Sequence, residues 1–130
     1  MTEQTTAPTW LVQAAQGLAA GDVEAWMAMY ADDAVHEFPF APEPRRLEGK
    51  TAIRRYMAAM GGSVRFGSLD HIRVDDRGEE LLVEAEGHHT DAVTGEPFDL
   101  SYLWIITRRD GLVTRMRDYM SPRRPAHRES

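Results

Sequence analysis

The chain has 130 residues, the length of one domain with one hydrophobic core. Twenty-one Asp and Glu against fifteen Lys and Arg give a net charge of −6, the wrong sign for a protein that binds nucleic acid through its phosphates. The absence of cysteine excludes disulfides, thiolate nucleophiles and Cys-ligated metal centres, and Lys50 is the one lysine that could form a Schiff base.

No apolar run approaches the ~18 to 20 residues that a membrane span needs, and the N-terminal segment has no signal-peptide pattern. We therefore expect a soluble, cytoplasmic protein that does not associate with membranes. The polar N-terminal residues and the proline-rich, basic C-terminal residues are typical of mobile ends. The expected organisation is a flexible leader at 1–8, a single domain over 9–122 and a flexible basic tail over 123–130.

Three helices are predicted in the first half of the chain. Apolar residues at helical spacing predict a helix over 10–18, ended by Gly21, and a second over 23–30. A third helix follows Gly49 and stops at the glycine pair 61–62. The apolar face of each helix predicts that all three pack against one common surface.

Strands are expected at 34–38 and, after a proline-containing loop at 39–44, throughout the second half of the chain. Turn residues separate four long strands, at about 64–74, 81–90, 98–108 and 112–120. Their short connections favour an antiparallel meander. The expected fold class is α+β, with helices packed on one face of a curved sheet.

Strand alternation assigns two polar residues to inward faces. His89 shares its side of the strand with Leu81 and Val83, and Asp118 shares its side with Met116 and Met120. Burying an ionised carboxylate without partners is costly, so Asp118 is expected to have a hydrogen-bonding or functional role. A hydrogen-bonded core residue is an equally simple interpretation of His89.

The strand at 98–108 carries apolar residues on both faces. Such a strand is covered on both sides, one by the helices and the other by a second subunit. This pattern predicts a homodimer.

Two stretches of sequence resemble a known family. The first is Tyr30-Ala-Asp-Asp-Ala-Val-His-Glu-Phe-Pro-Phe, followed by Leu47-Glu-Gly-Lys-Thr-Ala-Ile-Arg-Arg-Tyr56. The second is the region of the C-terminal strands, which contains Gly87-His-His-Thr and Arg117-Asp-Tyr-Met. Both resemble the NTF2-like proteins, small cone-shaped domains that include nuclear transport factor 2, ketosteroid isomerases and SnoaL-like polyketide cyclases. The resemblance covers about Trp10 to Pro122 and implies three N-terminal helices packed in a curved, mostly antiparallel sheet. One fold carries many reactions, so it does not imply the reaction.

The resemblance separates two branches of that family. The proton-shuttling aspartate, the phenol and the protonated aspartate of the ketosteroid isomerases fall at Phe38, Ala14 and Leu103, so that mechanism is not supported. The SnoaL-like cyclases fit better, because their histidine falls at His89 and their acid/base aspartate at Asp118.

In a meander the strands of His89 and Asp118 are two spacings apart, about 10 Å before curvature. The two side chains should therefore flank one bound molecule, and either could be the base. The remaining cavity candidates are mainly aromatic or apolar: His36, Phe38, Tyr56, Trp26, Met116 and Met120. Such a wall predicts a site for a small apolar molecule. The resemblance to polyketide cyclases implies that this molecule contains a carbonyl group.

The main hypothesis is a cofactor-independent acid/base enzyme of secondary metabolism, a SnoaL-like cyclase, isomerase or dehydratase acting on a polyketide-like carbonyl compound. Neither a cofactor nor a metal is expected, since Glu84, Glu86 and His88 alternate on one face without a metal-binding signature. One alternative is a non-catalytic small-ligand-binding or dimerisation module of the same fold. Another is an epoxide hydrolase, which needs a second inward acid, for which Asp99 is the candidate.

Overall fold

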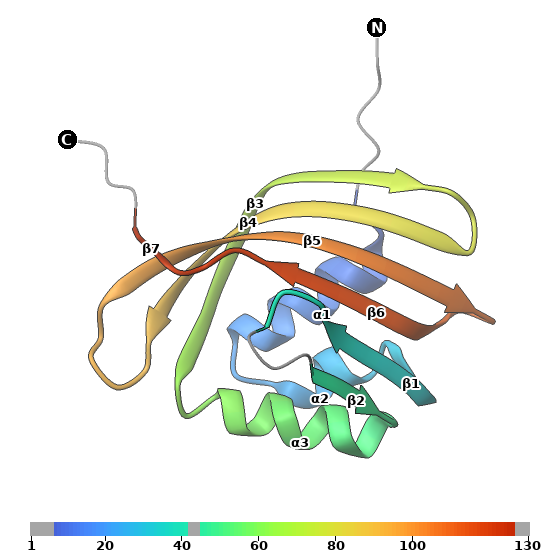
Figure 1. Ribbon diagram of the computed structural model, residues 1–130, viewed down its shortest axis with the longest axis horizontal. Helices are drawn as coiled ribbons and strands as arrows, with labels where there is room; N and C mark the ends of the chain where they lie inside the picture. Colours follow the sequence, from blue (N-terminus) through green and yellow to red (C-terminus); the bar gives the residue numbers. More distant parts are fainter. Residues whose placement is uncertain (1–6, 42–44, 127–130) are drawn as a thin grey trace, which may run out of the picture.

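The computed structural model describes residues 7–41 and 45–126 (Figure 1). Its helices are α1 (Thr9–Ala19), α2 (Val23–Met27) and α3 (Lys50–Met60). Its strands are β1 (Tyr30–Phe38), β2 (Arg45–Glu48), β3 (Val64–Asp76), β4 (Glu80–Asp91), β5 (Pro97–Arg109), β6 (Leu112–Met120) and β7 (Arg124–Pro125). The strands form one strongly curved sheet, and the helices lie on its concave side, so the α+β prediction is confirmed.

The sheet is mostly antiparallel, as expected. Its strand order is β2-β1-β6-β5-β4-β3, and β7 pairs with β5. The predicted meander is the run from β3 to β6, in which every neighbouring pair is antiparallel. The first strand differs, because β1 lies parallel to β6 and places the N-terminal half of the chain beside its C-terminal strand.

The second helix is shorter than its apolar periodicity predicts. It ends at Met27, and Tyr30 begins β1 instead of completing the helix. The carbonyl of Met29 accepts a hydrogen bond from the backbone N–H of Val113 at 2.8 Å, which starts the pairing of β1 with β6. Tertiary pairing therefore overrides the helical pattern here. Strand β2, which follows a proline-containing stretch, was not predicted either.

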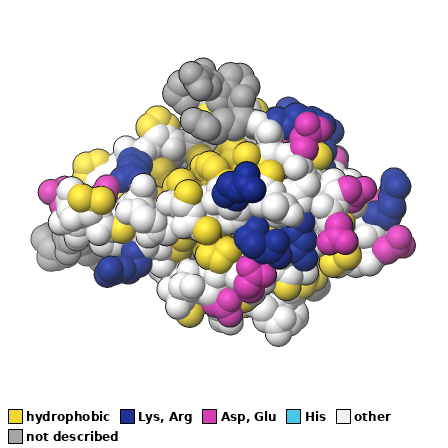
Figure 2. Space-filling view, turned by 90° about the horizontal axis from the view of Figure 1, so that it is seen from below, with side chains coloured by type: hydrophobic (Ala, Val, Ile, Leu, Met, Phe, Trp, Pro, Cys, Tyr) yellow, Lys and Arg dark blue, Asp and Glu magenta, His cyan; other side chains and the backbone are white. Residues whose placement is uncertain are grey.

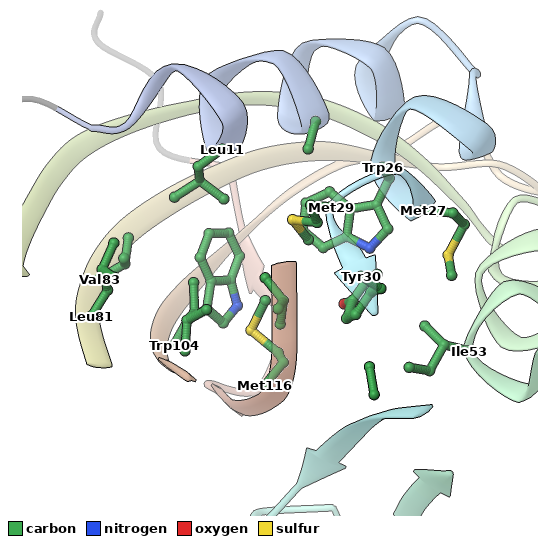
Figure 3. Close-up of a cluster of buried hydrophobic side chains, with 14 of the residues drawn as sticks. Leu11, Trp26, Met27, Met29, Tyr30, Ile53, Leu81, Val83, Trp104 and Met116 are labelled. Atoms are coloured by element: carbon green, nitrogen blue, oxygen red, sulfur yellow. The ribbon is translucent and has the colours of Figure 1, made fainter. Parts of the chain in front are cut away.

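The core lies between the helices and the concave face of the sheet (Figure 3). Trp26 of α2 and Trp104 of β5 meet edge to face with ring centroids 6.2 Å apart. Tyr30 packs against Trp26 with centroids 6.4 Å apart. Met116, predicted to line a cavity, is completely buried beside Trp104 in this core. Aromatic pairs of this kind add to the free energy gained from burying their apolar area.

The predicted inward faces agree with the burial along the strands. On β4, Leu81, Val83 and His89 are all buried. On β6, Met116 and Asp118 are buried as expected, but Val113 is buried as well, although alternation places it on the other face. A register shift between Thr107 and Arg108 of the partner strand locally breaks the alternation.

The described part of the C-terminal tail, which was predicted to be mobile, instead lies against the sheet. Strand β7 pairs with β5, Arg123 forms an ion pair with Asp91 at 2.9 Å, and Arg124 forms one with Glu86 at 2.8 Å. Residues 127–130 and most of the predicted leader, 1–6, lie outside the described residues.

Charged side chains of both signs lie next to one another on the face in Figure 2, with hydrophobic side chains visible among them. Among the ion pairs of the described residues, Glu37 contacts Arg46 and Arg115, each at 2.8 Å. These Arg contacts lower the pKa of the Glu37 carboxyl. Within the described residues, no helix has both the length and the apolarity needed to cross a bilayer.

Candidate active site

A cavity of about 340 Å³ opens between the concave face of the sheet and the helices. This volume lies within the range of small-molecule sites, roughly 300 to 1,000 Å³. Its walls are mostly apolar or aromatic, with a few polar side chains. The lining side chains that contain a nitrogen or oxygen atom are Trp26, His36, Tyr56, His89, Tyr102, Trp104, Asp118, Ser121 and Arg123.

Asp118 is held on the cavity wall by the strand register. It lies directly opposite Trp104 on the neighbouring strand, and the indole Nε1–H of Trp104 donates to Asp118 Oδ1 at 2.9 Å. The second carboxylate oxygen, Oδ2, lies 3.1 Å from His36 Nε2. Both oxygens therefore meet a ring N–H, a donor set matched to an ionised carboxylate.

His36 connects Asp118 to a buried phenol. The hydroxyl of Tyr30 lies 2.9 Å from His36 Nδ1. Burial, with a smaller effect from the negative charge of Asp118, raises the pKa of Tyr30, so its hydroxyl keeps its proton and can donate it to an unprotonated Nδ1. A neutral His36 then carries its proton on Nε2 and donates to Asp118. In this tautomer the hydrogen bonds run in one direction, from Tyr30 through His36 to Asp118.

His89 is engaged at both ring nitrogens. The backbone N–H of Gly67 donates to its Nδ1 at 3.0 Å, and its Nε2 lies 2.7 Å from the hydroxyl of Tyr102. Burial, with a smaller contribution from the charge of His88, lowers the pKa of His89 to about 4. At neutral pH the ring is therefore uncharged. Because Nδ1 accepts a hydrogen bond, the single proton is on Nε2.

Two glycines allow close packing around His89, one against the backbone of its strand and one against its ring. A Cβ at Gly67 would overlap the backbone carbonyl of His88. A Cβ at Gly87 would lie 2.5 Å from His89 Nε2 and 2.6 Å from Cε2 of Tyr102. Gly87, the first residue of the Gly87-His-His-Thr stretch quoted for the resemblance, is therefore required for packing in this chain.

The structure places His89 and Asp118 on the same cavity but farther apart along the sheet than expected. His89 lies opposite Phe98 and Asp118 lies opposite Trp104, so they are offset by six residues along β5. This offset adds about 20 Å of extended strand to the two inter-strand spacings expected from a meander. Tyr102 lies between them, and curvature brings both side chains to one cavity.

Most of the other predicted cavity residues also line this cavity. Phe38 stacks on His36 with ring centroids 4.6 Å apart, and Tyr56 packs on Phe38 at 5.0 Å. Trp26 and Met120 contribute further apolar wall. Met116 does not line the cavity, since its side chain is fully buried in the core.

The sequence did not predict four side chains that line the cavity or hydrogen-bond to its lining: Tyr30, Tyr102, Trp104 and Arg123. The first three carry a polar group on an otherwise apolar face, and a buried Tyr or Trp usually finds a hydrogen-bond partner. That was the signal available in the sequence. Arg123 lies with its guanidinium 4.1 Å above the ring of Phe98, in a segment expected to be mobile.

Asp99 does not supply a second acid in the cavity. It is buried, but on the opposite face of β5, where its Oδ1 lies 2.9 Å from His88 Nδ1. His88 also contacts Asp70 at 2.9 Å, and the two carboxylates together raise the pKa of His88. Among the described residues, Asp118 is the one carboxylate that lines the cavity. No group of three His, Asp or Glu side chains there is arranged to hold a metal ion.

Comparison with known proteins agrees with this architecture. The model of the SnoaL-like domain family matches residues 11–116. Among curated proteins, YesE of Bacillus subtilis is 36% identical over 107 residues, which cover 78% of this chain and 71% of that protein. That relative has no characterised function.

Two solved structures share the fold. A Bacillus subtilis protein with the provisional name isomerase superposes with a TM-score of 0.80 at 31% identity, covering 87% of this chain and 84% of its own. A Xanthomonas campestris protein, provisionally called a polyketide cyclase, has a TM-score of 0.72 at 24% identity, with 85% and 86% covered. The predicted NTF2-like fold is thereby confirmed. At 24% identity, the similarity to the Xanthomonas campestris protein supports the fold alone.

Proposed function

The chain belongs to the SnoaL-like domain family, and we propose that it is an acid/base enzyme that moves a proton next to a carbonyl group, as a cyclase, isomerase or dehydratase does. The proposed substrate is a polyketide-like carbonyl compound of secondary metabolism, and no cofactor is required.

Asp118 carries this proposal. A carboxylate on the wall of an apolar cavity is costly unless it is hydrogen-bonded, and here two ring N–H groups hold it. Each oxygen accepts one hydrogen bond and has a further acceptor position available. Trp104 and His36 also restrict rotation of the carboxylate, so the base is held in place before the substrate arrives.

Of the two candidate bases, the contacts favour Asp118 over His89. A general base needs an unprotonated atom within reach of the substrate. In His89, Nδ1 accepts the backbone N–H of Gly67 and Nε2 carries the proton. His89 is therefore assigned a role through its neighbour Tyr102 and not a proton transfer of its own.

The cavity suits a small carbonyl compound. A volume of about 340 Å³ holds a molecule of one or two rings, and the walls offer mainly aromatic and aliphatic contacts. The epoxide hydrolase alternative has less support, because Asp99, the candidate second acid, hydrogen-bonds to His88 on the opposite face of the sheet.

Exchange of an α-proton for deuterium tests the proposal without knowledge of the final product. Cyclic and linear β-diketones are incubated with the protein in deuterated buffer, and loss of the α-proton signal is followed by NMR. We expect the protein to accelerate exchange in at least one compound and Asp118→Asn to lower that rate by at least about 100-fold, the low end for a general base.

Asp118→Asn is compatible with the surrounding hydrogen bonds. The amide oxygen can still accept from Trp104, and the amide N–H can donate to His36 if that ring moves its proton to Nδ1. Asp33→Asn, an exposed change on β1, is the matched control. A rate unchanged by Asp118→Asn would remove Asp118 from the mechanism. Ligand binding without any exchange would instead support the binding-module alternative.

A further inference from the structure

Tyr102 presents a hydroxyl between His89 and Asp118 on the cavity wall. It is on the same face of β5 as Trp104, two residues away, and Trp104 is the residue opposite Asp118. Tyr102 and Asp118 are therefore diagonal neighbours across two strands, a relation in which Cα atoms are about 7 to 8 Å apart. A carbonyl group and its α-carbon fit between two side chains at that spacing.

The direction of the hydrogen bond to His89 decides what the Tyr102 hydroxyl can do. Because Gly67 N–H occupies Nδ1, the His89 proton is on Nε2 and is donated to the phenolic oxygen at 2.7 Å. A phenol has one donor hydrogen of its own, and this one is not used toward His89. The O–H of Tyr102 can therefore be donated to a molecule in the cavity.

We propose that Tyr102 is a catalytic residue that donates a hydrogen bond to the carbonyl oxygen of the substrate, and that His89 is the positioning residue that orients it. This inference rests on the proposed function, because it assigns the partner of Asp118 in the same reaction. The substrate class is correspondingly narrowed to compounds whose carbonyl oxygen gains negative charge in the reaction.

The step is balanced without an added reactant. Asp118 takes the α-proton, the electrons of that C–H bond form a carbon–carbon double bond, and the carbonyl π electrons move to oxygen. Tyr102 holds this enolate oxygen and keeps its own proton. Asp118 then returns the proton to another carbon in an isomerisation, or to the oxygen of a second carbonyl that the enolate carbon has attacked in a ring closure.

The surroundings keep Tyr102 a donor and not an acid. Burial, and to a smaller extent the negative charge of Asp118, raises the pKa of Tyr102. Its phenol therefore remains protonated at neutral pH, and it stabilises negative charge by hydrogen bonding. Donation from His89 to the phenolic oxygen polarises the O–H group further.

A planar phenolate tests this donor without any turnover. The probe is 4-nitrophenol at a pH at which it is ionised, since its oxygen carries the charge that an enolate oxygen would carry. Binding is measured in the Asp118→Asn background, where no cavity carboxylate repels the probe. We expect Tyr102→Phe in that background to weaken binding by about tenfold to hundredfold, the loss of one hydrogen bond to a charged acceptor.

Tyr119→Phe is the matched control, because it makes the same chemical change on the opposite face of the adjacent strand. Equal affinity for the Tyr102→Phe and Tyr119→Phe variants would overturn the inference. The proposed function would then still stand or fall by the α-proton exchange of the Asp118→Asn variant, which does not involve this probe.

Substitution of His89 separates its positioning role from a purely structural one. His89→Gln retains an N–H that can reach Tyr102, whereas His89→Leu does not. In the otherwise unsubstituted protein we expect Tyr102→Phe to lower the α-proton exchange rate about 100- to 1,000-fold, as loss of one oxyanion donor does. His89→Gln should retain most of the rate that His89→Leu loses, and equal losses in folded variants would contradict the assigned role.

Discussion

Lowering the pH should destabilise this protein through a single buried imidazole. The pKa of His89 is lowered from 6.5 to about 4 in the folded state, chiefly by burial. Between these values the unfolded chain binds a proton that the folded protein does not, so the free energy of unfolding falls as the pH falls. A difference of about 2.5 pKa units corresponds to roughly 3 kcal/mol, fully present above pH 6.5 and lost toward pH 4.

Urea unfolding at several pH values between 7 and 4.5 measures this effect. His89→Gln is the comparison variant, since glutamine does not titrate and the other ionisable groups are common to both chains. We expect the free energy of unfolding of the unsubstituted protein to fall with pH more steeply than that of the variant, by about 2 kcal/mol over this pH range. Parallel curves would show that His89 is not held neutral, and the assignment of its proton to Nε2 would be refuted.

Three further substitutions have defined outcomes. Gly87→Ala places a methyl group against His89 and Tyr102 and should cost about 1 to 3 kcal/mol of unfolding free energy, measured in urea. Trp104→Phe removes one N–H from Asp118 and should cost at least about 1.5 kcal/mol by the same method, more than Trp10→Phe, whose ring lies under Arg108. The raised pKa of His88 stabilises the unsubstituted protein at low pH, and this stabilisation is lost as the pH rises from 6.5 through that pKa. His88→Gln removes the titrating group, so the free energy of unfolding of this variant should depend less on pH above 6.5 than that of the unsubstituted protein.

The inward positions of His89 and Asp118 were predictable because strand alternation depends only on the two-residue period. Both lie on regular parts of their strands, and both are buried. The same reasoning failed at Val113, where a register shift in the neighbouring strand breaks the period. Alternation therefore predicts the face of a residue only as far as the ladder stays regular.

The relative positions of residues on different strands could not be predicted, because alternation describes each strand separately. The six-residue offset between His89 and Asp118 depends on how β4 and β6 each register with β5, and the sequence does not encode that register in a readable form. The sequence pattern makes Tyr102 one of the apolar residues of the strand at 98–108, although its hydroxyl lies between His89 and Asp118. Tyr30 followed a helical period and began a strand, because pairing with β6 fixes its backbone.

The homodimer remains a prediction from the apolar outer positions of β5. Leu103 and Ile105 are partly buried on that face. Sedimentation equilibrium would check it, with a mass of twice 14.7 kDa expected and a mass of one chain contradicting it.

A crystal structure with bound 4-nitrophenolate tests most directly whether one molecule lies between a base and an oxyanion donor. In the Asp118→Asn variant, we expect the phenolate oxygen within hydrogen-bonding distance of the Tyr102 hydroxyl. The ring should lie in the cavity and face the substituted side chain at position 118. A phenolate oxygen bound at the Arg123 guanidinium, or a ligand outside the cavity, would contradict the account.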